Sequence, residues 1–71
     1  MRLLTVFPEL RRVLVNTKTG KTFSGALWRR RRGMVVLKGA ELVKPGGGAR
    51  LPLDGDLVVL ADNIDFIQVL S

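Results

Sequence analysis

The 71-residue chain contains no cysteine and no histidine. A chain without cysteine has no disulfide framework, and a chain that also lacks histidine has no ordinary zinc site. No stretch approaches the roughly 20 apolar residues of a membrane span, and Pro8 and Glu9 interrupt the apolar start before a signal-peptide core can form. We therefore expect a soluble, cytoplasmic protein with no metal and no membrane contact.

Candidate catalytic residues are scarce as well. Ser24 and Ser71 have no candidate base beside them in the sequence. The aspartates of the C-terminal half fall at expected strand ends, where solvated turn roles are usual, and they lack the spacing of an oxygen-ligand loop: Asp54, Asp56, Asp62 and Asp65. The sequence thus predicts a protein that is not an enzyme, has no catalytic residues and needs no cofactor.

Two glycine-containing segments resemble nucleotide-binding loops only in part. TKTGKT (Thr17 to Thr22) ends in the Gly-Lys-Thr of a phosphate-binding loop, but Val15 stands where an earlier glycine is needed. The residues that follow continue a strand instead of opening a helix. PGGGAR (Pro45 to Arg50) similarly lacks the strand-to-helix context of a dinucleotide fingerprint. A hairpin turn and a loop explain the two segments better.

The charge is unevenly distributed along the chain. The formal net charge is +6, yet residues 1–38 hold ten lysines and arginines against Glu9 alone, and residues 39–71 are net acidic. Four arginines are consecutive in LWRRRRG (Leu27 to Gly33), next to the only tryptophan. One basic surface of this kind favours nucleic acid or another polyanion. The alternative is charge that only keeps the protein soluble.

The apolar residues recur with the period of strands. They predict five strands at residues 11–17, 22–30, 34–43, 57–61 and 64–70, with turns at Lys18–Lys21, Gly33 and Asp62–Asn63, a bend at Gly39 and a mobile, dispensable loop over 44–56. Asp and Asn tolerate left-handed turn geometry. One helical turn is expected near Pro8–Arg11. The prediction is a single all-β domain over residues 1–71, a small, strongly bent antiparallel SH3-like barrel.

The last two predicted strands are apolar on both faces. By alternation, Leu57, Val59 and Ala61 oppose Val58 and Leu60, while Ile64, Phe66 and Leu70 oppose Ile67 and Val69. So short a chain covers only one of these faces, which predicts a partner on the other. The alternative is a curled barrel that buries some outward positions at its corners.

This layout resembles the Sm and Sm-like family. The first family motif is matched by Gly20, Phe23, Gly25 and Leu27, and the second by Asp62, Asn63 and Ile64 with Phe66 and Ile67 behind them. The resemblance covers roughly residues 10–70. It implies an Sm-like fold and a closed homo-oligomeric ring, pentamer to heptamer, held by the last two strands. The implied interface residues are Leu57, Val58, Val59, Leu60, Ile64, Phe66, Ile67 and Val69.

The sequence departs from the family at the base-binding positions. The family places an Asp and, four residues on, an Asn after the second strand, whereas Arg30 to Val35 contains neither. Leu60-Ala61 replaces the Arg-Gly of the second motif, so Asn63 alone remains of the base pocket. What the resemblance implies for fold and ring assembly therefore transfers better than what it implies for uridine recognition.

We interpret the arginine tract as a contact for RNA or other single-stranded nucleic acid, with little sequence specificity. If Leu27 points into the barrel, alternation places Trp28, Arg30 and Arg32 on the opposite face. The predicted binding residues are Trp28, Arg29, Arg30, Arg31, Arg32, Lys38 and Asn63. The alternative is a purely structural ring, for example an assembly component of a phage or mobile element. In that case Trp28 packs in an interface and the arginines are a solvated strand end.

Overall fold

The computed structural model describes residues 11–44, 46 and 48–70. It contains six strands and a short 3₁₀ helix: β1 (Arg11–Thr17), β2 (Thr22–Arg31), β3 (Met34–Val43), β4 (Arg50–Pro52), β5 (Leu57–Leu60), η3 (Ala61–Asn63) and β6 (Ile64–Val69). All strand pairs are antiparallel. The all-β prediction is confirmed, with β4 as an additional strand. The helical turn expected at Pro8–Arg11 lies outside the described residues except for Arg11, which begins β1.

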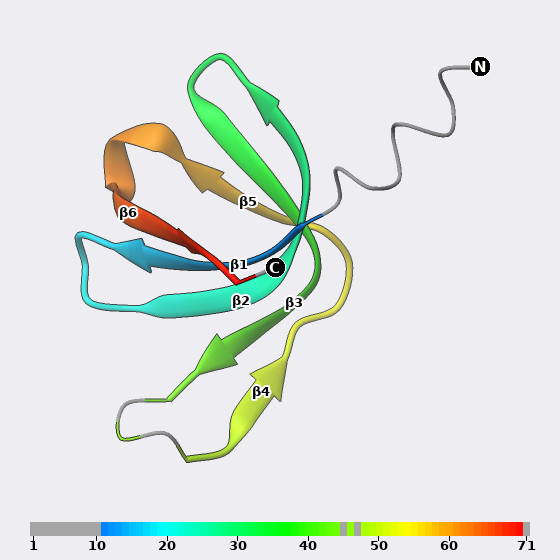
Figure 1. The fold of residues 1–71 in the computed structure, drawn as a ribbon, viewed down its shortest axis with the longest axis vertical. Helices are drawn as coiled ribbons and strands as arrows, with labels where there is room; N and C mark the ends of the chain where they lie inside the picture. The colour runs from blue at the N-terminus through cyan, green and yellow to red at the C-terminus, as the bar shows by residue number, and fades with distance from the viewer. Residues whose placement is uncertain (1–10, 45, 47, 71) are drawn as a thin grey trace.

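The strands form one sheet in the order β4-β3-β2-β1-β6, and β5 pairs separately with β3. β3 therefore has β2 on one side and, on the other, β5 near its start and β4 near its end (Figure 1). β5 pairs only with β3 and β6 only with β1 among the described strands. Hydrogen bonds between these strands do not close the sheet into a barrel, and β5 and β6 each keep a free backbone edge.

The predicted bend at Gly39 is confirmed. Gly39 has a φ of 60°, and the register between β2 and β3 shifts between Ser24 and Ala26. Two residues of β3, Gly39 and Ala40, lie opposite Gly25 alone, which is the geometry of a β-bulge and bends the strand. A Cβ at Gly25 would lie 3.2 Å from the Ala40 Cα and 3.2 Å from the Lys38 carbonyl oxygen. The close approach of the two strands here depends on a missing side chain.

A second bulge, at Trp28, reverses the alternation expected along β2. Leu27 pairs with Leu37 but Arg29 pairs with Val36, so Trp28 has no partner on β3. Beyond the bulge Arg30 pairs with Val35, a buried residue on the same face as Leu37. The alternation that placed Arg30 opposite Leu27 is therefore wrong, because the inserted residue shifts all later side chains by one position.

A third bulge, at Asp65, does the same in β6. Thr17 pairs with Ile64 and Asn16 with Phe66, which leaves Asp65 as the extra residue. Ile64 and Ile67 consequently both pack against the core. The prediction that these two isoleucines point to opposite faces is wrong for that reason.

The core is small. Among the described residues it consists of six buried apolar residues, Val13, Val15, Val35, Leu37, Ala40 and Val59, with partly buried residues around them: Phe23, Leu27, Leu53, Leu57, Ile64 and Ile67. The outward positions of β5 stay half exposed, Val58 at 50% and Leu60 at 60%. The alternative that corners of the fold bury these positions therefore does not apply to the single chain.

The segment expected as a mobile loop over 44–56 is partly ordered sheet. β4 pairs with Glu41–Val43, and the Leu53 N–H donates to the Ala40 carbonyl oxygen at 3.0 Å. The Arg50 guanidinium reaches across β3, donates to the buried Ser24 hydroxyl at 3.1 Å and lies 3.6 Å from a Glu41 carboxylate oxygen. Because these contacts tie β4 to both β3 and β2, the prediction that the whole segment is a mobile loop is wrong. That it is dispensable for the fold stays a prediction.

The other turns follow from local chemistry. The chain reverses over Lys18–Gly20 between β1 and β2, and the φ of 92° at Gly20 confirms the expected hairpin turn. Gly33, with a φ of 79°, turns the chain between β2 and β3. Asp62–Asn63 adopts 3₁₀ geometry instead of the left-handed conformation allowed for in the sequence, since all positive φ values in the described residues belong to glycines.

We predict that Gly25→Ala lowers the free energy of unfolding by about 1–3 kcal/mol, because its methyl group would press on backbone atoms that cannot rotate away. Gly48→Ala is the control. A Cβ there meets nothing within 4 Å, so stability should be unchanged or slightly raised. Urea unfolding of both variants gives the measurement. Equal midpoints for the two variants would show that β2 and β3 are not tightly packed at the bend.

Candidate nucleic-acid interface

The arginine tract lies at the tip of a long hairpin formed by the end of β2 and the start of β3. Arg29, Arg30 and Arg31 pair with Val36, Val35 and Met34, and Arg32-Gly33 makes the turn. We call Arg29–Gly33 the arginine hairpin. Arg30 shares the face of the buried Val35, whereas Arg29 and Arg31 share the other face. The positive charge is thus presented on both faces of the hairpin.

The four arginine side chains are all exposed. In the part of the chain that the structure describes, the ion pairs are Lys38 with Asp56 and Arg50 with Glu41, and neither involves the arginine hairpin. Its charges therefore have no acidic partner among those residues. Guanidinium groups in this condition attract phosphates and can form two parallel hydrogen bonds to one phosphate group.

Trp28 and Lys38 lie together at the base of the arginine hairpin. The Lys38 ammonium is 4.9 Å from the centroid of the Trp28 ring, a cation–π contact. The same ammonium is 3.2 Å from one Asp56 carboxylate oxygen and 3.4 Å from the other. Asp56, just before β5, thus holds Lys38 beside an indole that remains 40% exposed. Asp56 is exposed, as expected of a solvated turn residue, and the pairing of β5 with β3 adds its contact with Lys38.

Asn63 occupies the turn next to the arginine hairpin. The Ala61 N–H, at the start of η3, donates to the Gly33 carbonyl oxygen at 3.0 Å, and the Asn63 carbonyl oxygen accepts a hydrogen bond of 2.7 Å from the Lys18 N–H. The η3 turn therefore contacts both the arginine hairpin and the β1–β2 turn, and Figure 1 shows η3 between these two turns. The exposed Lys18 adds a positive charge there that sequence spacing alone did not connect with Asn63.

The predicted interface residues divide into two groups. Val59 is buried, and Leu57, Ile64 and Ile67 pack against the core. The others remain open to solvent: Val58 at 50%, Leu60 at 60%, Phe66 at 55% and Val69 at 55%. They lie on β5 and β6, each of which keeps a free edge among the described strands, as β4 also does. Exposed apolar edge strands promote pairing with another chain.

Two further features bear on the kind of protein. Among the described residues no helix has the length and apolar character needed to cross a membrane. The same residues contain no cluster of three or more side chains of the metal-binding types.

Comparison with solved structures places this arrangement in a known fold. A heptameric archaeal Sm protein superposes with a TM-score of 0.76 at 23% identity, over 96% of this chain and 98% of that one. The SmAP1 heptamer of P. aerophilum superposes with a TM-score of 0.74, also at 23% identity, over 100% of this chain and 96% of that one. No protein-family model matches the chain. A search of curated proteins gives no match either.

The chain therefore has the Sm-like fold, as its sequence motifs predicted. Both of these structures are heptamers, and the two are similar to this chain over nearly its whole length. They give no support to a phage origin.

Proposed function

We propose that the protein is a single Sm-like domain over residues 1–71 that assembles into a homo-oligomeric ring of five to seven subunits. The ring binds RNA or other single-stranded nucleic acid with little sequence specificity, acts without catalysis, and works in the cytoplasm. The observation that carries the proposal is the arginine hairpin, which presents four exposed arginines without an acidic partner among the described residues and has Trp28 at its base.

Ring assembly is supported by what the single chain leaves uncovered. β5 and β6 each have a free edge in the described sheet, and four apolar side chains on them are at least half exposed. Pairing β5 of one subunit with β6 of the next satisfies both edges and buries these side chains. This burial would stabilise each subunit, because a short chain with a small core buries too little surface to be more than marginally stable alone. The two heptamers with the same fold are consistent with such a closure.

Binding of single strands is supported by the chemistry of the arginine hairpin. The bulge at Trp28 sends Arg29 and Arg31 to one face and Arg30 to the other, so charge surrounds the hairpin. Phosphates contacted from several directions are recognised by charge and carry no sequence information. Trp28 supplies a flat apolar surface on which any base can stack. With the Asp and Asn of the family's base pocket replaced by Arg30 to Val35, little remains to select one base.

The alternative is a ring with a purely structural role. It is favoured by the same loss of base-pocket residues and by the replacement of Arg-Gly with Leu60-Ala61. The two functions differ in a simple property. Nucleic acid that co-purifies at low salt and is lost at high salt indicates binding, whereas a ring indifferent to polyanions indicates the structural role.

We predict that Val58→Asp converts the ring to monomers. Val58 is 50% exposed in the single chain, so the substitution should spare the fold while placing a charge at the β5 edge. Leu51→Asp is the matched control, because Leu51 is 49% exposed but lies on β4. Light scattering gives the mass of each variant. A parent protein that is a stable monomer at micromolar concentration would contradict ring assembly outright.

The double variant Arg30→Ser, Arg32→Ser should weaken the binding of single-stranded RNA and flatten its salt dependence. Each phosphate neutralised on a single strand contributes about 0.7 to the log–log slope, so the loss is roughly 1 to 1.5 for each subunit engaged. Arg11→Ser, Arg12→Ser removes the same charge from β1 and serves as the control. Fluorescence anisotropy at several salt concentrations measures both slopes. An unchanged slope in the first variant would favour the structural ring.

Trp28 and Asp56 should affect binding in opposite directions. Trp28→Ala is expected to weaken binding by about 1–3 kcal/mol per stacked base with little change in slope. Asp56→Asn should strengthen binding, because Lys38 loses its carboxylate partner and becomes available to a phosphate. Asp54→Asn, which removes the same charge two residues earlier, is the control and should have the smaller effect. Identical affinities for the two aspartate variants would show that Lys38 does not contribute.

A further inference from the structure

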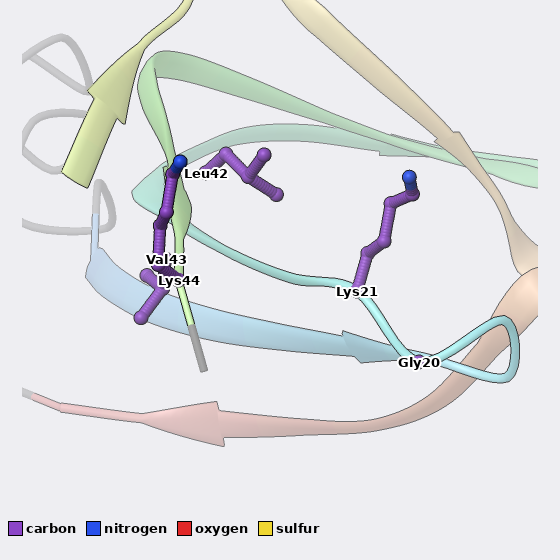
Figure 2. A pocket seen from close by; sticks show the side chains of 5 residues that line it. All are labelled: Gly20, Lys21, Leu42, Val43 and Lys44. Atoms are coloured by element: carbon purple, nitrogen blue, oxygen red, sulfur yellow. The ribbon is translucent and has the colours of Figure 1, made fainter. Parts of the chain in front are cut away.

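A second basic feature lies away from the arginine hairpin, at the other end of β3. A hollow of about 250 Å³ is lined by Gly20 and Lys21 from the β1–β2 turn and by Leu42, Val43 and Lys44 from the end of β3 and the residue after it. We call these five residues the lysine hollow. Figure 2 shows the Lys21 and Lys44 side chains on either side, with Leu42 projecting between them. β3 separates it from the arginine hairpin, since Met34 pairs with Arg31 and Val43 pairs with Thr22.

The two lysines of the hollow have no carboxylate partner in the described part of the chain. Glu41, the acidic residue nearest in sequence to Lys44, is paired with Arg50, and the other ion pair joins Lys38 to Asp56. Both lysine side chains are exposed. Two like charges beside one small space raise the local positive potential and favour the binding of an anion there.

One wall of the lysine hollow is held firmly by hydrogen bonds. The Lys21 N–H donates to the Thr17 hydroxyl oxygen at 3.0 Å, and the same hydroxyl lies 2.8 Å from the Lys21 carbonyl oxygen, to which it donates. The Thr17 N–H donates to that carbonyl at 2.9 Å. Thr17 is itself buried. The turn is therefore fixed before a ligand arrives, and only the lysine side chains must be ordered on binding.

The rest of the wall is apolar, because it is formed by Leu42 and Val43. Both residues are only partly buried, so their side chains remain accessible to a ligand. A bare phosphate ion would contact the lysines and leave this surface wet. A nucleotide offers a phosphate for the ammonium groups and a sugar and base for the apolar wall. The volume of the hollow, about 250 Å³, is below the roughly 300–1,000 Å³ of sites for drug-sized ligands. A hollow of this size accommodates part of one nucleotide and not an extended strand.

We propose that the lysine hollow is a nucleotide-binding site, with the phosphate contacted by the Lys21 and Lys44 ammonium groups and the sugar or base against Leu42 and Val43. Of the Gly20-Lys21-Thr22 sequence the site uses Gly20 and Lys21, without the geometry of a phosphate-binding loop. The site does not depend on the arginine hairpin and binds a nucleotide whether or not that hairpin contacts nucleic acid.

The test is an NMR titration of the whole protein with adenosine 5′-monophosphate at low salt. The amides of Gly20 and Lys21 and the methyl groups of Leu42 and Val43 should shift together. The double variant Lys21→Gln, Lys44→Gln should weaken this binding about ten-fold, the loss expected for two exposed charge contacts. The control, Arg11→Gln with Arg12→Gln, removes the same charge from β1, outside the residues that line the hollow, and should bind like the parent. Thermal unfolding checks that both variants are folded.

Three results would overturn the proposal: no shift at these residues, equal weakening in the two variants, or inorganic phosphate binding as tightly as the nucleotide. The first means that there is no site, the second that the attraction is diffuse charge, and the third that the apolar wall is unused. The outcome is separate from that of the arginine variants, which are read from the salt dependence of RNA binding. Each proposal can therefore fail while the other stands.

Discussion

The pairing of β3 with three other strands is the constraint on which the rest of the structure depends. β2 follows β3 along most of its length, β5 pairs with Met34–Leu37, and β4 pairs with Glu41–Val43. β3 pairs with both β5 and β4 on the same side because it bends at Gly39. At the bend, the missing side chain of Gly25 lets β2 and β3 approach closely. The bend sends the two ends of β3 in different directions, and the two hairpins that contain them lie at opposite ends of the molecule (Figure 1).

The strands themselves could be predicted from the sequence because their signals are local. Period-2 alternation located β1, β2, β3, β5 and β6 to within a residue. Gly20, Gly33 and Gly39, three of the five described glycines with a positive φ, marked two turns and the bend. β4 was missed because it is three residues long, contains Pro52 and follows a glycine-rich stretch. What defines it is non-local, namely its pairing with β3 and the reach of Arg50 to Ser24.

The candidate site was predictable in composition but not in geometry. The arginine tract and Trp28 are evident in the sequence, yet the face that each arginine occupies depends on the bulge at Trp28, which only the register with β3 defines. The same holds for Asp65, whose bulge turns both Ile64 and Ile67 inward. Alternation predicts the face of a side chain correctly only where the pairing of the two strands contains no bulge. The contact of Lys38 with Trp28 and Asp56 joins three separate segments and leaves no signal in the sequence.

In the proposed ring, charge and edge pairing act on each other. Arg31 of β2 pairs with Met34 of β3, and Met34 pairs with Leu60 of β5. The arginines of β2 are therefore two strands away from the free edge of β5. In the free chain this charge opposes unspecific association of an apolar edge. In a closed ring the hairpins of all subunits repeat, and their mutual repulsion works against assembly. A bound polyanion neutralises that repulsion and so makes the free energy of ring assembly more favourable. Because coupling between two equilibria is reciprocal, ring assembly makes the free energy of polyanion binding more favourable by the same amount. The arginine hairpin thus ties the stability of the assembly to the ligand that the ring is proposed to hold.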